Sequence, residues 1–211
     1  MVQLEEQALV TRDRRVRNGL LFIPDISGFT ELVHSTDVLT GKQITFELLS
    51  AVIGENDLEL NIAEVEGDAI LFYRYGEAPS SCDLAQQYAK MAKAFETRLA
   101  ELQKEFSMPL DLSLKVIAHY GPMTEYKIGG FKKLYGEVVV EAHRLLKNSI
   151  ESDSYLLLTD SLLELSGTVD AEELLQYGVR TNRVSEVYGP LGIISFTYFD
   201  FTDKKIFKQV A

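Results

Sequence analysis

The sequence has little of what marks secreted, membrane-spanning or nucleic-acid-binding proteins. Its single cysteine, Cys82, excludes an internal disulfide and is typical of a reducing, cytoplasmic environment. No apolar run approaches the length of a membrane-spanning helix, and residues 1–19 contain no apolar signal-peptide core. Lysine and arginine number 21 against 32 acidic residues, and the formal charge of -11 argues against a protein that binds nucleic acid. A Walker-type phosphate loop, a Ser-His-Asp order and a His-rich metal spacing are also missing from the sequence.

What is present favours one soluble domain. With 211 residues, 46% of them hydrophobic and 25% charged, the chain is long enough to bury a sizeable core. We find no internal repeat, low-complexity tract or long linker. We therefore expect a leader segment over residues 1–19, followed by a single, stand-alone, cytoplasmic domain over residues 20–211.

The first informative stretch joins a short apolar run to a turn that contains glycine. Leu20 to Ile23 is continuously apolar, too short for a helix and typical of a central strand. Pro24 cannot donate to a sheet ladder, so we expect the strand to end there and Asp25 to lie at its end. The amides around Gly28 then open a helix, and free N–H groups at a helix start attract phosphate and other anions.

A second stretch, residues 64–70, predicts a hairpin with a carboxylate at its tip. Gly67 and Asp68 separate two strand-like runs. Two carboxylates on turns, Asp68 and Asp25, with an anion-ready loop beside one of them, are what a site for a divalent metal and a triphosphate needs. The simpler interpretation is that both are ordinary turn residues, because aspartate is common in turns.

Hydrophobic periodicity along the rest of the chain predicts an α+β protein. The pattern has both the 3.6-residue period of helices and the two-residue alternation of strands. Thr40 is the expected N-cap of the second helix, and Gly121-Pro122 is expected to separate two strands. The expected helices cover residues 28–34, 40–53, 80–106, 137–146 and 161–165, with a helical or irregular segment at 171–175. The expected strands cover residues 20–23, 58–64, 69–73, 112–119, 123–128, 154–159, 184–187 and 193–199.

Three short motifs follow one another along the chain: DISGFT at 25–30, GDA at 67–69 and GEVVVEAHRL at 136–145. They resemble, in order, the D-I-x-G-F-T, G-D-A and G-[DN]-x-V-N-x-A-x-R-[LM] signatures of the class III nucleotidyl cyclases. The resemblance covers roughly residues 20–199. It implies an α+β, ferredoxin-like (split βαβ) palm with extra C-terminal strands. It also implies a reaction in which the ribose 3′-oxygen attacks the α-phosphorus and pyrophosphate leaves.

The resemblance assigns a two-metal site to the first two motifs. Asp25 and Asp68 correspond to the carboxylate ligands of two Mg²⁺ or Mn²⁺ ions, and the backbone carbonyl of Ile26 is a further ligand. The amides that would face the nucleoside triphosphate belong to Ser27, Gly28, Phe29 and Thr30. This half of the site has the residues that the family pattern asks for.

The third motif departs from the pattern. Val140 replaces the family asparagine that positions the ribose, and valine has no hydrogen-bonding side-chain atom. Arg144, one turn further along the same face, occupies the transition-state arginine position and could neutralise developing phosphate charge. The alternative for Arg144 is an exposed helix arginine paired with Glu141 or Glu137. The late basic residue of the family is also missing from residues 187–192.

The two positions that read the base are changed as well. They hold Glu64 and Lys133 in place of the lysine and aspartate of adenylate-type enzymes. Glu64 is the residue type of guanylate-specific members, but Lys133 is not the cysteine expected alongside it. The pair therefore allows either guanine recognition or a salt bridge that fills the pocket without a purine. His119 is expected to be structural, and His143 is expected to face solvent, with a partner subunit as the alternative.

These observations leave three candidate functions. The favoured one is a divergent or degenerate domain that binds a divalent metal and a nucleoside triphosphate with weak or no turnover. The second is an active guanylate or adenylate cyclase, and the third is a non-catalytic dimerisation or regulatory module. Because cyclase sites form between two subunits, the resemblance also implies a head-to-tail, two-fold homodimer, with Asp25 and Asp68 from one subunit facing Val140 and Arg144 of the other.

Overall fold

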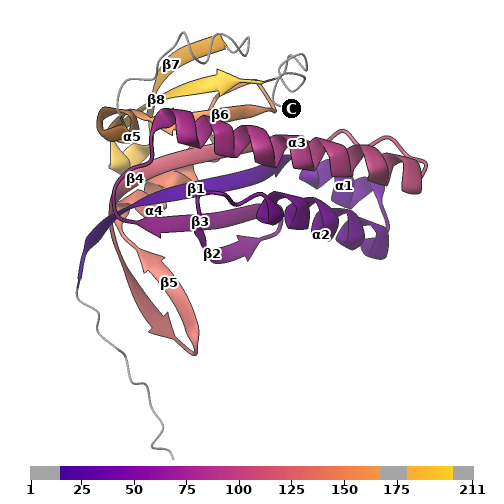
Figure 1. The fold of residues 1–211 in the computed structure, drawn as a ribbon, viewed down its shortest axis with the longest axis horizontal. Coiled ribbons are helices and arrows are strands. Elements are labelled where there is room, and N and C mark those ends of the chain that lie inside the picture. Colours follow the sequence, from indigo (N-terminus) through magenta and orange to yellow (C-terminus); the bar gives the residue numbers. More distant parts are fainter. Residues whose placement is uncertain (1–14, 167–179, 202–211) are drawn as a thin grey trace, which may run out of the picture.

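A computed structural model describes residues 15–166 and 180–201. Its described strands form one mixed sheet in the order β2-β3-β1-β4-β6-β8-β7, and β5 pairs with β4 (Figure 1). The strands are β1 (Arg17–Ser27), β2 (Asn61–Glu66), β3 (Ala69–Tyr75), β4 (Ser113–Ile128), β5 (Phe131–Tyr135), β6 (Tyr155–Thr159), β7 (Arg180–Val187) and β8 (Ile193–Asp200). The helices are α1 (Phe29–Ser35), α2 (Val38–Gly54), α3 (Ser81–Glu105), α4 (Glu137–Leu145), α5 (Asp160–Ser166) and the 3₁₀ turn η1 (Gly189–Leu191). The expected α+β class is confirmed.

The sheet carries an apolar core on each face. Successive side chains of β1 alternate between them, as a strand buried on both faces requires. Leu20 and Phe22 pack into the larger core with α2 and α3, whereas Leu21 and Ile23 pack into the smaller core with α4. In Figure 1, α3 runs across one face of the sheet and α4 lies behind it. The α4 face is the one that carries the candidate site.

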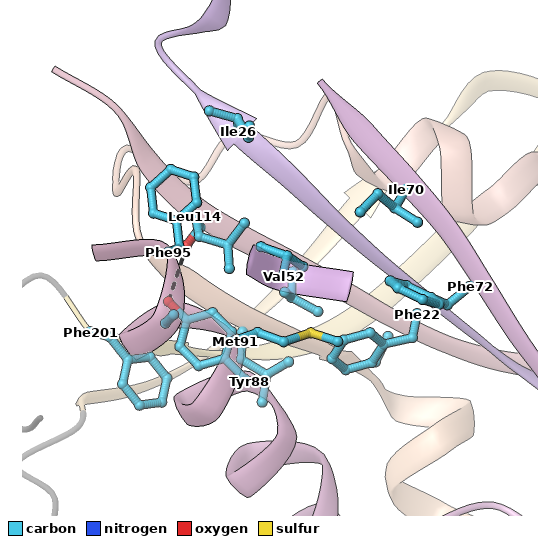
Figure 2. Packing of buried hydrophobic residues seen from close by; sticks show 14 of the residues in the cluster. Phe22, Ile26, Val52, Ile70, Phe72, Tyr88, Met91, Phe95, Leu114 and Phe201 are labelled. Atoms are coloured by element: carbon cyan, nitrogen blue, oxygen red, sulfur yellow. Dashed lines mark hydrogen bonds between the residues drawn. The ribbon is translucent and has the colours of Figure 1, made fainter. Parts of the chain in front are cut away.

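The larger core is dense and aromatic. Phe22, Phe72 and Met91 gather between β1, β3 and α3 (Figure 2). Tyr88 of α3 packs its ring 4.5 Å from the ring of Phe201. Its hydroxyl donates a hydrogen bond to the carbonyl oxygen of Leu114, 3.1 Å away, so the buried polar atom is satisfied (Figure 2).

The helix ends follow local capping chemistry. The Ser80 hydroxyl accepts from the Asp83 N–H, and the Asp83 carboxylate accepts from the Ser80 N–H, which is a capping box at the start of α3. For α2 the expected cap is wrong. Asp37, not Thr40, is the N-cap, and its carboxylate accepts from the N–H groups of Leu39 and Thr40. The cap lies three residues earlier than expected, so the helix begins at Val38.

β1 continues through Pro24, where the sequence pattern predicted its end. Pro24 is paired with Val116 of β4. The ladder between β1 and β3, in contrast, is interrupted at residues 23 and 24 and resumes with Asp25 opposite Ala69. A proline is tolerated here because its missing donor coincides with that gap. Asp25 is therefore part of the sheet and not of a turn.

β2 begins at Asn61, later than the alternating pattern predicted. The residues before it form a loop that side chains hold. Asn56 accepts from the Leu60 N–H (3.0 Å) and donates to the Leu60 carbonyl oxygen (2.8 Å). Gln87 of α3 accepts from the Leu58 N–H (2.9 Å). These side-chain bonds replace the strand ladder, as they often do at asparagine.

β4 is one strand of 16 residues where two were expected. Gly121 and Pro122 stay in register with Gly19 and Asn18 of β1. A Cβ on Gly121 would lie 3.1 Å from a methyl group of Val138, so the glycine lets α4 pack closely on the strand. The second half of β4 pairs with β5, and this hairpin, residues 124–135, projects from the body as an arm (Figure 1).

The remaining expected elements are present in the described residues. They include α4 after Gly136, β6, α5 and the C-terminal hairpin of β7 and β8. The expected segment at 171–175 lies outside the described residues. Within those residues, no helix has both the length and the apolar character needed to cross a membrane.

Candidate functional site

Asp25 and Asp68 lie on neighbouring parts of the sheet. Asp25 is opposite Ala69 in the pairing of β1 with β3, and Asp68 directly precedes Ala69 in the two-residue turn between β2 and β3. The N–H of Ile26 donates to the backbone carbonyl oxygen of Asp68 at 3.2 Å, which ties the two segments together. The hairpin tip expected at Gly67-Asp68 is confirmed.

The two aspartates line one shallow pocket of about 180 Å³. The pocket is unusually acidic, because four of its nine lining residues carry carboxylates. Its walls are Ile23, Asp25, Glu64, Glu66, Asp68, Ala69, Leu71, His143 and Leu146. Neither Asp68 nor Glu66 has an ion-pair partner among the described residues. The pocket therefore presents uncompensated negative charge.

This environment shifts the pKa of Asp68. Burial raises the pKa of its carboxyl group above the usual value, and the negative charge of Asp25 raises it further. A hydrogen bond from its own backbone N–H and the charge of Lys115 act in the opposite direction but do not cancel the shift. The carboxylate form of Asp68 would thus be favoured by any cation that entered the pocket.

Asp25 already has a cationic partner. Lys115 of β4 is directly opposite Asp25 in the strand register, and its Nζ lies 2.9 Å from Oδ2. Burial lowers the pKa of the Lys115 ammonium, but the hydrogen bond and charge of Asp25, with smaller contributions from Tyr155 and Asp68, outweigh it and raise the pKa. Lys115 is therefore charged, and it neutralises one of the two aspartates.

The loop that the sequence assigned to phosphate binding lies beside this pair. These residues, 27–30, are the last residue of β1, the connecting Gly28 and the first two residues of α1. A Cβ placed on Gly67 would lie 3.8 Å from the ring of Phe29, so the start of α1 adjoins the hairpin tip. The structure thus brings Asp25, Asp68 and the loop into one region.

Gly28 fixes the path of this loop. Its φ of +85° is a conformation that glycine adopts at no steric cost, and an added Cβ would lie 2.3 Å from the carbonyl oxygen of Asp111. No side chain among the described residues caps the first turn of α1. The hydroxyl of Ser27 is buried and has no hydrogen-bond partner within that part of the chain. Ser27 and Gly28 line a separate pocket with Phe95 of α3, so this segment borders the acidic pocket without lining it.

The donor set fits a hard divalent cation in type, although it is sparse. Carboxylate oxygens are the protein ligands that Mg²⁺ and Mn²⁺ prefer. Within residues 15–166 and 180–201, no three acidic, histidine or cysteine side chains converge as a closed metal cage. Magnesium sites that work on nucleotides commonly use one or two carboxylates and take further ligands from phosphate and water. Asp25 and Asp68 match that arrangement, with Lys115 as a competing cation.

Glu64 and Lys133 form an ion pair between β2 and β5. Of the two arrangements that the sequence allowed, the salt bridge is the one present. The hydrogen bond to Glu64 raises the pKa of Lys133. The carboxylate that would accept from a guanine base is therefore already engaged by a residue of the same chain.

Val140 and Arg144 lie away from this pocket, on the outer face of α4. Val140 is 50% exposed, and Arg144 is exposed one turn further on. Arg144 has no ion pair among the described residues. The expected partner Glu141 instead lies 2.8 Å from Nε2 of the buried His119, and that hydrogen bond lowers the pKa of the Glu141 carboxyl group. Both third-motif residues, Val140 and Arg144, are exposed on the surface of the chain.

The sequence interpretation missed two residues near the aspartates, and one of them, His143, lines the pocket. Lys115 contacts Asp25. In the sequence it is visible only as a lysine within the alternating pattern of the strand at residues 112–119. His143 was expected to face solvent, but it lines the pocket beside Asp68. The sequence indicated this position of His143 only through helical spacing, because His143 comes three residues after Val140 and lies on a neighbouring face of the same helix.

The fold that carries this site is that of class III adenylyl and guanylyl cyclase domains. The guanylyl cyclase Cya2 is similar with a TM-score of 0.67 and 13% identity, and the match covers 88% of this chain and 92% of that one. A class III adenylyl cyclase-like ATP-binding protein from Pseudomonas aeruginosa has a TM-score of 0.62 and 16% identity, over 76% of this chain and 36% of that one. At these identities the comparisons show the fold alone, and the expected palm is confirmed.

The chain belongs to the family described as "Protein of unknown function (DUF2652)", whose model matches residues 45–155, more than half of the sequence. A curated relative, "Uncharacterized protein Rv2561/Rv2562" of Mycobacterium tuberculosis (strain ATCC 25618 / H37Rv), is 34% identical over 125 residues. That alignment covers 54% of this chain and 56% of the relative, so it spans little more than half of either protein. The family match includes the hairpin tip and α4 but begins after Asp25.

Proposed function

We propose that this chain is a divergent class III nucleotidyl cyclase-like domain that binds a divalent metal and a nucleoside triphosphate with weak or no turnover. The observation that carries the proposal is the placement of Asp25 and Asp68 in one acidic pocket beside the uncapped loop at residues 27–30. The cyclase fold supports it, as does the fold-level likeness to a protein that is itself described as cyclase-like and ATP-binding.

In this proposal some residues bind the metal and the triphosphate, and another position would orient the ribose. Asp25 and Asp68, with the carbonyl oxygen of Ile26, would present oxygens to Mg²⁺ or Mn²⁺, and the amides of residues 27–30 would face the triphosphate. When bound, the metal would supply positive charge that neutralises the phosphates and activates the ribose hydroxyl. Val140 has no atom to orient the ribose, so we infer that the bound nucleotide reacts slowly.

Mn²⁺ with a nucleoside triphosphate is expected to raise the melting temperature of the native chain, and Asp25→Asn is expected to abolish the shift. A ligand that binds only the folded state stabilises it by about 2.7 kcal/mol at a hundredfold excess over Kd. Asn keeps the shape of Asp25 but removes its charge. The measurement is differential scanning fluorimetry with each of the four triphosphates, and Asp57→Ala, an exposed residue paired with Lys90, is the control.

The same samples also show whether the chain converts the nucleoside triphosphate to a cyclic product. Chromatographic assay for 3′,5′-cyclic nucleotide is expected to find little or none. Abundant product that disappears in Asp25→Asn would make the chain an active guanylate or adenylate cyclase instead. No shift with any triphosphate, from folded protein, would contradict the binding proposal.

A second candidate is a non-catalytic dimerisation or regulatory module that keeps only the fold. The observation that favours it is that Lys115 and Lys133 already neutralise Asp25 and Glu64 within the chain. Such a module would show no metal-dependent melting shift in the native chain or in Asp25→Asn, so the melting experiment also separates the two candidates.

We also propose that the chain forms a homodimer through the β4–β5 arm. The arm exposes large apolar side chains, of which Phe131 is 71% exposed, and such side chains are typical of interfaces. Its exposed members are Tyr126, Ile128, Phe131 and Tyr135. A partner on this side would bring the outward-facing Val140 and Arg144 toward the pocket of the other subunit.

Phe131→Glu is expected to weaken this dimer at least about tenfold, because a charge would be buried at the centre of the contact. Light scattering at tens of micromolar measures the mass of the native chain and of the variant. Phe46→Glu, at an exposed phenylalanine of α2, is the control and should remain dimeric. A native chain that is monomeric at this concentration contradicts the proposal.

A further inference from the structure

Asp25 lies between two neighbours of opposite charge. Asp68 is on its β3 side, and Lys115 is on its β4 side, directly opposite in the strand register. The Nζ of Lys115 is 2.9 Å from Oδ2 of Asp25. The side chains of Lys115 and Asp25 are only 20% and 13% exposed, so water and salt screen this contact less than they would screen a surface pair.

An ammonium group and a divalent cation make competing demands on one carboxylate. A hard metal ion binds best to an oxygen whose negative charge is uncompensated. Lys115 donates to one oxygen of Asp25 and offsets that charge. A metal on the other oxygen would also lie a few ångströms from the ammonium, where two positive charges repel strongly in a partly buried site.

We propose that Lys115 is a built-in competitor for the cation at Asp25 and that it sets the divalent-metal affinity of this site. The inference rests on the proposed function, because it takes Asp25 and Asp68 as the metal-binding pair. In the free chain, the Lys115 ammonium offsets the charge of Asp25, so this carboxylate has a cationic partner without a metal. Metal binding then requires the ammonium to be displaced or tolerated, and the affinity falls.

The test is a titration of Mn²⁺ alone into the full chain, with free Mn²⁺ measured by electron paramagnetic resonance. Lys115→Met removes the charge and keeps most of the side-chain length. We expect its Kd for Mn²⁺ to be at least about tenfold lower than that of the native chain. Lys115→Arg, which keeps the charge, is expected to stay within about threefold of native. Lys90→Met, which removes an exposed lysine paired with Asp57, is the matched control and should not change the Kd.

A second readout is the melting temperature, which is measured first without metal and then with Mn²⁺. Without Mn²⁺, Lys115→Met leaves Asp25 without its cation beside the like-charged Asp68, so we expect a lower melting temperature, which Mn²⁺ should restore. If Lys115→Met failed to fold, Lys115→Gln would serve for the same comparison, because its amide still donates to Asp25 without a charge.

The outcomes separate this inference from the proposed function. An unchanged or weaker Mn²⁺ affinity in a folded Lys115→Met or Lys115→Gln variant, with binding still lost in Asp25→Asn, overturns the role of Lys115 alone. Absence of Asp25-dependent Mn²⁺ binding in the native chain and in every Lys115 variant overturns both.

Discussion

Val140→Asn is expected to form 3′,5′-cyclic nucleotide at least about tenfold faster than the native chain, because misplacement of a reacting group by about 1 Å can cost a hundredfold in rate. Val140 is half exposed on α4, and Arg144 is exposed one turn away on the same face. An asparagine at Val140 would supply the donor and acceptor that the ribose position lacks. The measurement is chromatographic product formation from ATP and from GTP with Mn²⁺.

The control for this gain is Val38→Asn, at an exposed valine of α2. It should leave the rate unchanged. Val140→Asn should also keep the Mn²⁺-dependent melting shift of the native chain, since Val140 lies outside the acidic pocket. A folded, nucleotide-binding Val140→Asn variant with no gain in rate would show that ribose positioning does not limit the rate of cyclisation. The Glu64–Lys133 ion pair would then be the next position to substitute.

Phe22→Ala is expected to lower the free energy of unfolding by about 3–5 kcal/mol, which is the usual cost of truncating a buried phenylalanine. Phe22 is 0% exposed and lies in the middle of the larger core, on the central strand β1 (Figure 2). The rigid sheet around it cannot collapse to fill the cavity. Urea denaturation followed by circular dichroism measures the loss, which corresponds to a fall in melting temperature on the order of 10 °C for a chain of this size.

Phe46→Ala makes the same chemical change at a position that is 65% exposed on α2. It should change the free energy of unfolding by no more than about 0.5 kcal/mol. Similar losses in the two variants would mean that Phe22 is not the core residue that its burial indicates. Because β1 carries Asp25 as well as Phe22, a severe loss of packing here is also expected to disturb the acidic pocket.

Several elements could be predicted from the sequence because their signals are local. Ser80 and Asp83 are three residues apart, and together they form the capping box of α3. Gly67 and Asp68 are adjacent, and they make the two-residue turn between β2 and β3. The expectation failed at Pro24, which was expected to end the strand but is accommodated by pairing with strands distant in the sequence. β1 passes through Pro24 because the missing donor falls in a gap of the β1–β3 ladder, and that gap is a property of the paired strands.

The sequence by itself determined the α+β class, the two aspartates and the altered third motif, because residue identities and short spacings carry that information. Only the tertiary structure decided how the charges pair. Lys115 faces Asp25 through strand register, and Lys133 binds Glu64 across β2 and β5. The electrostatic energy of an ion pair depends on the distance between its charges and on their burial. The sequence gives neither quantity for two residues that lie far apart along the chain.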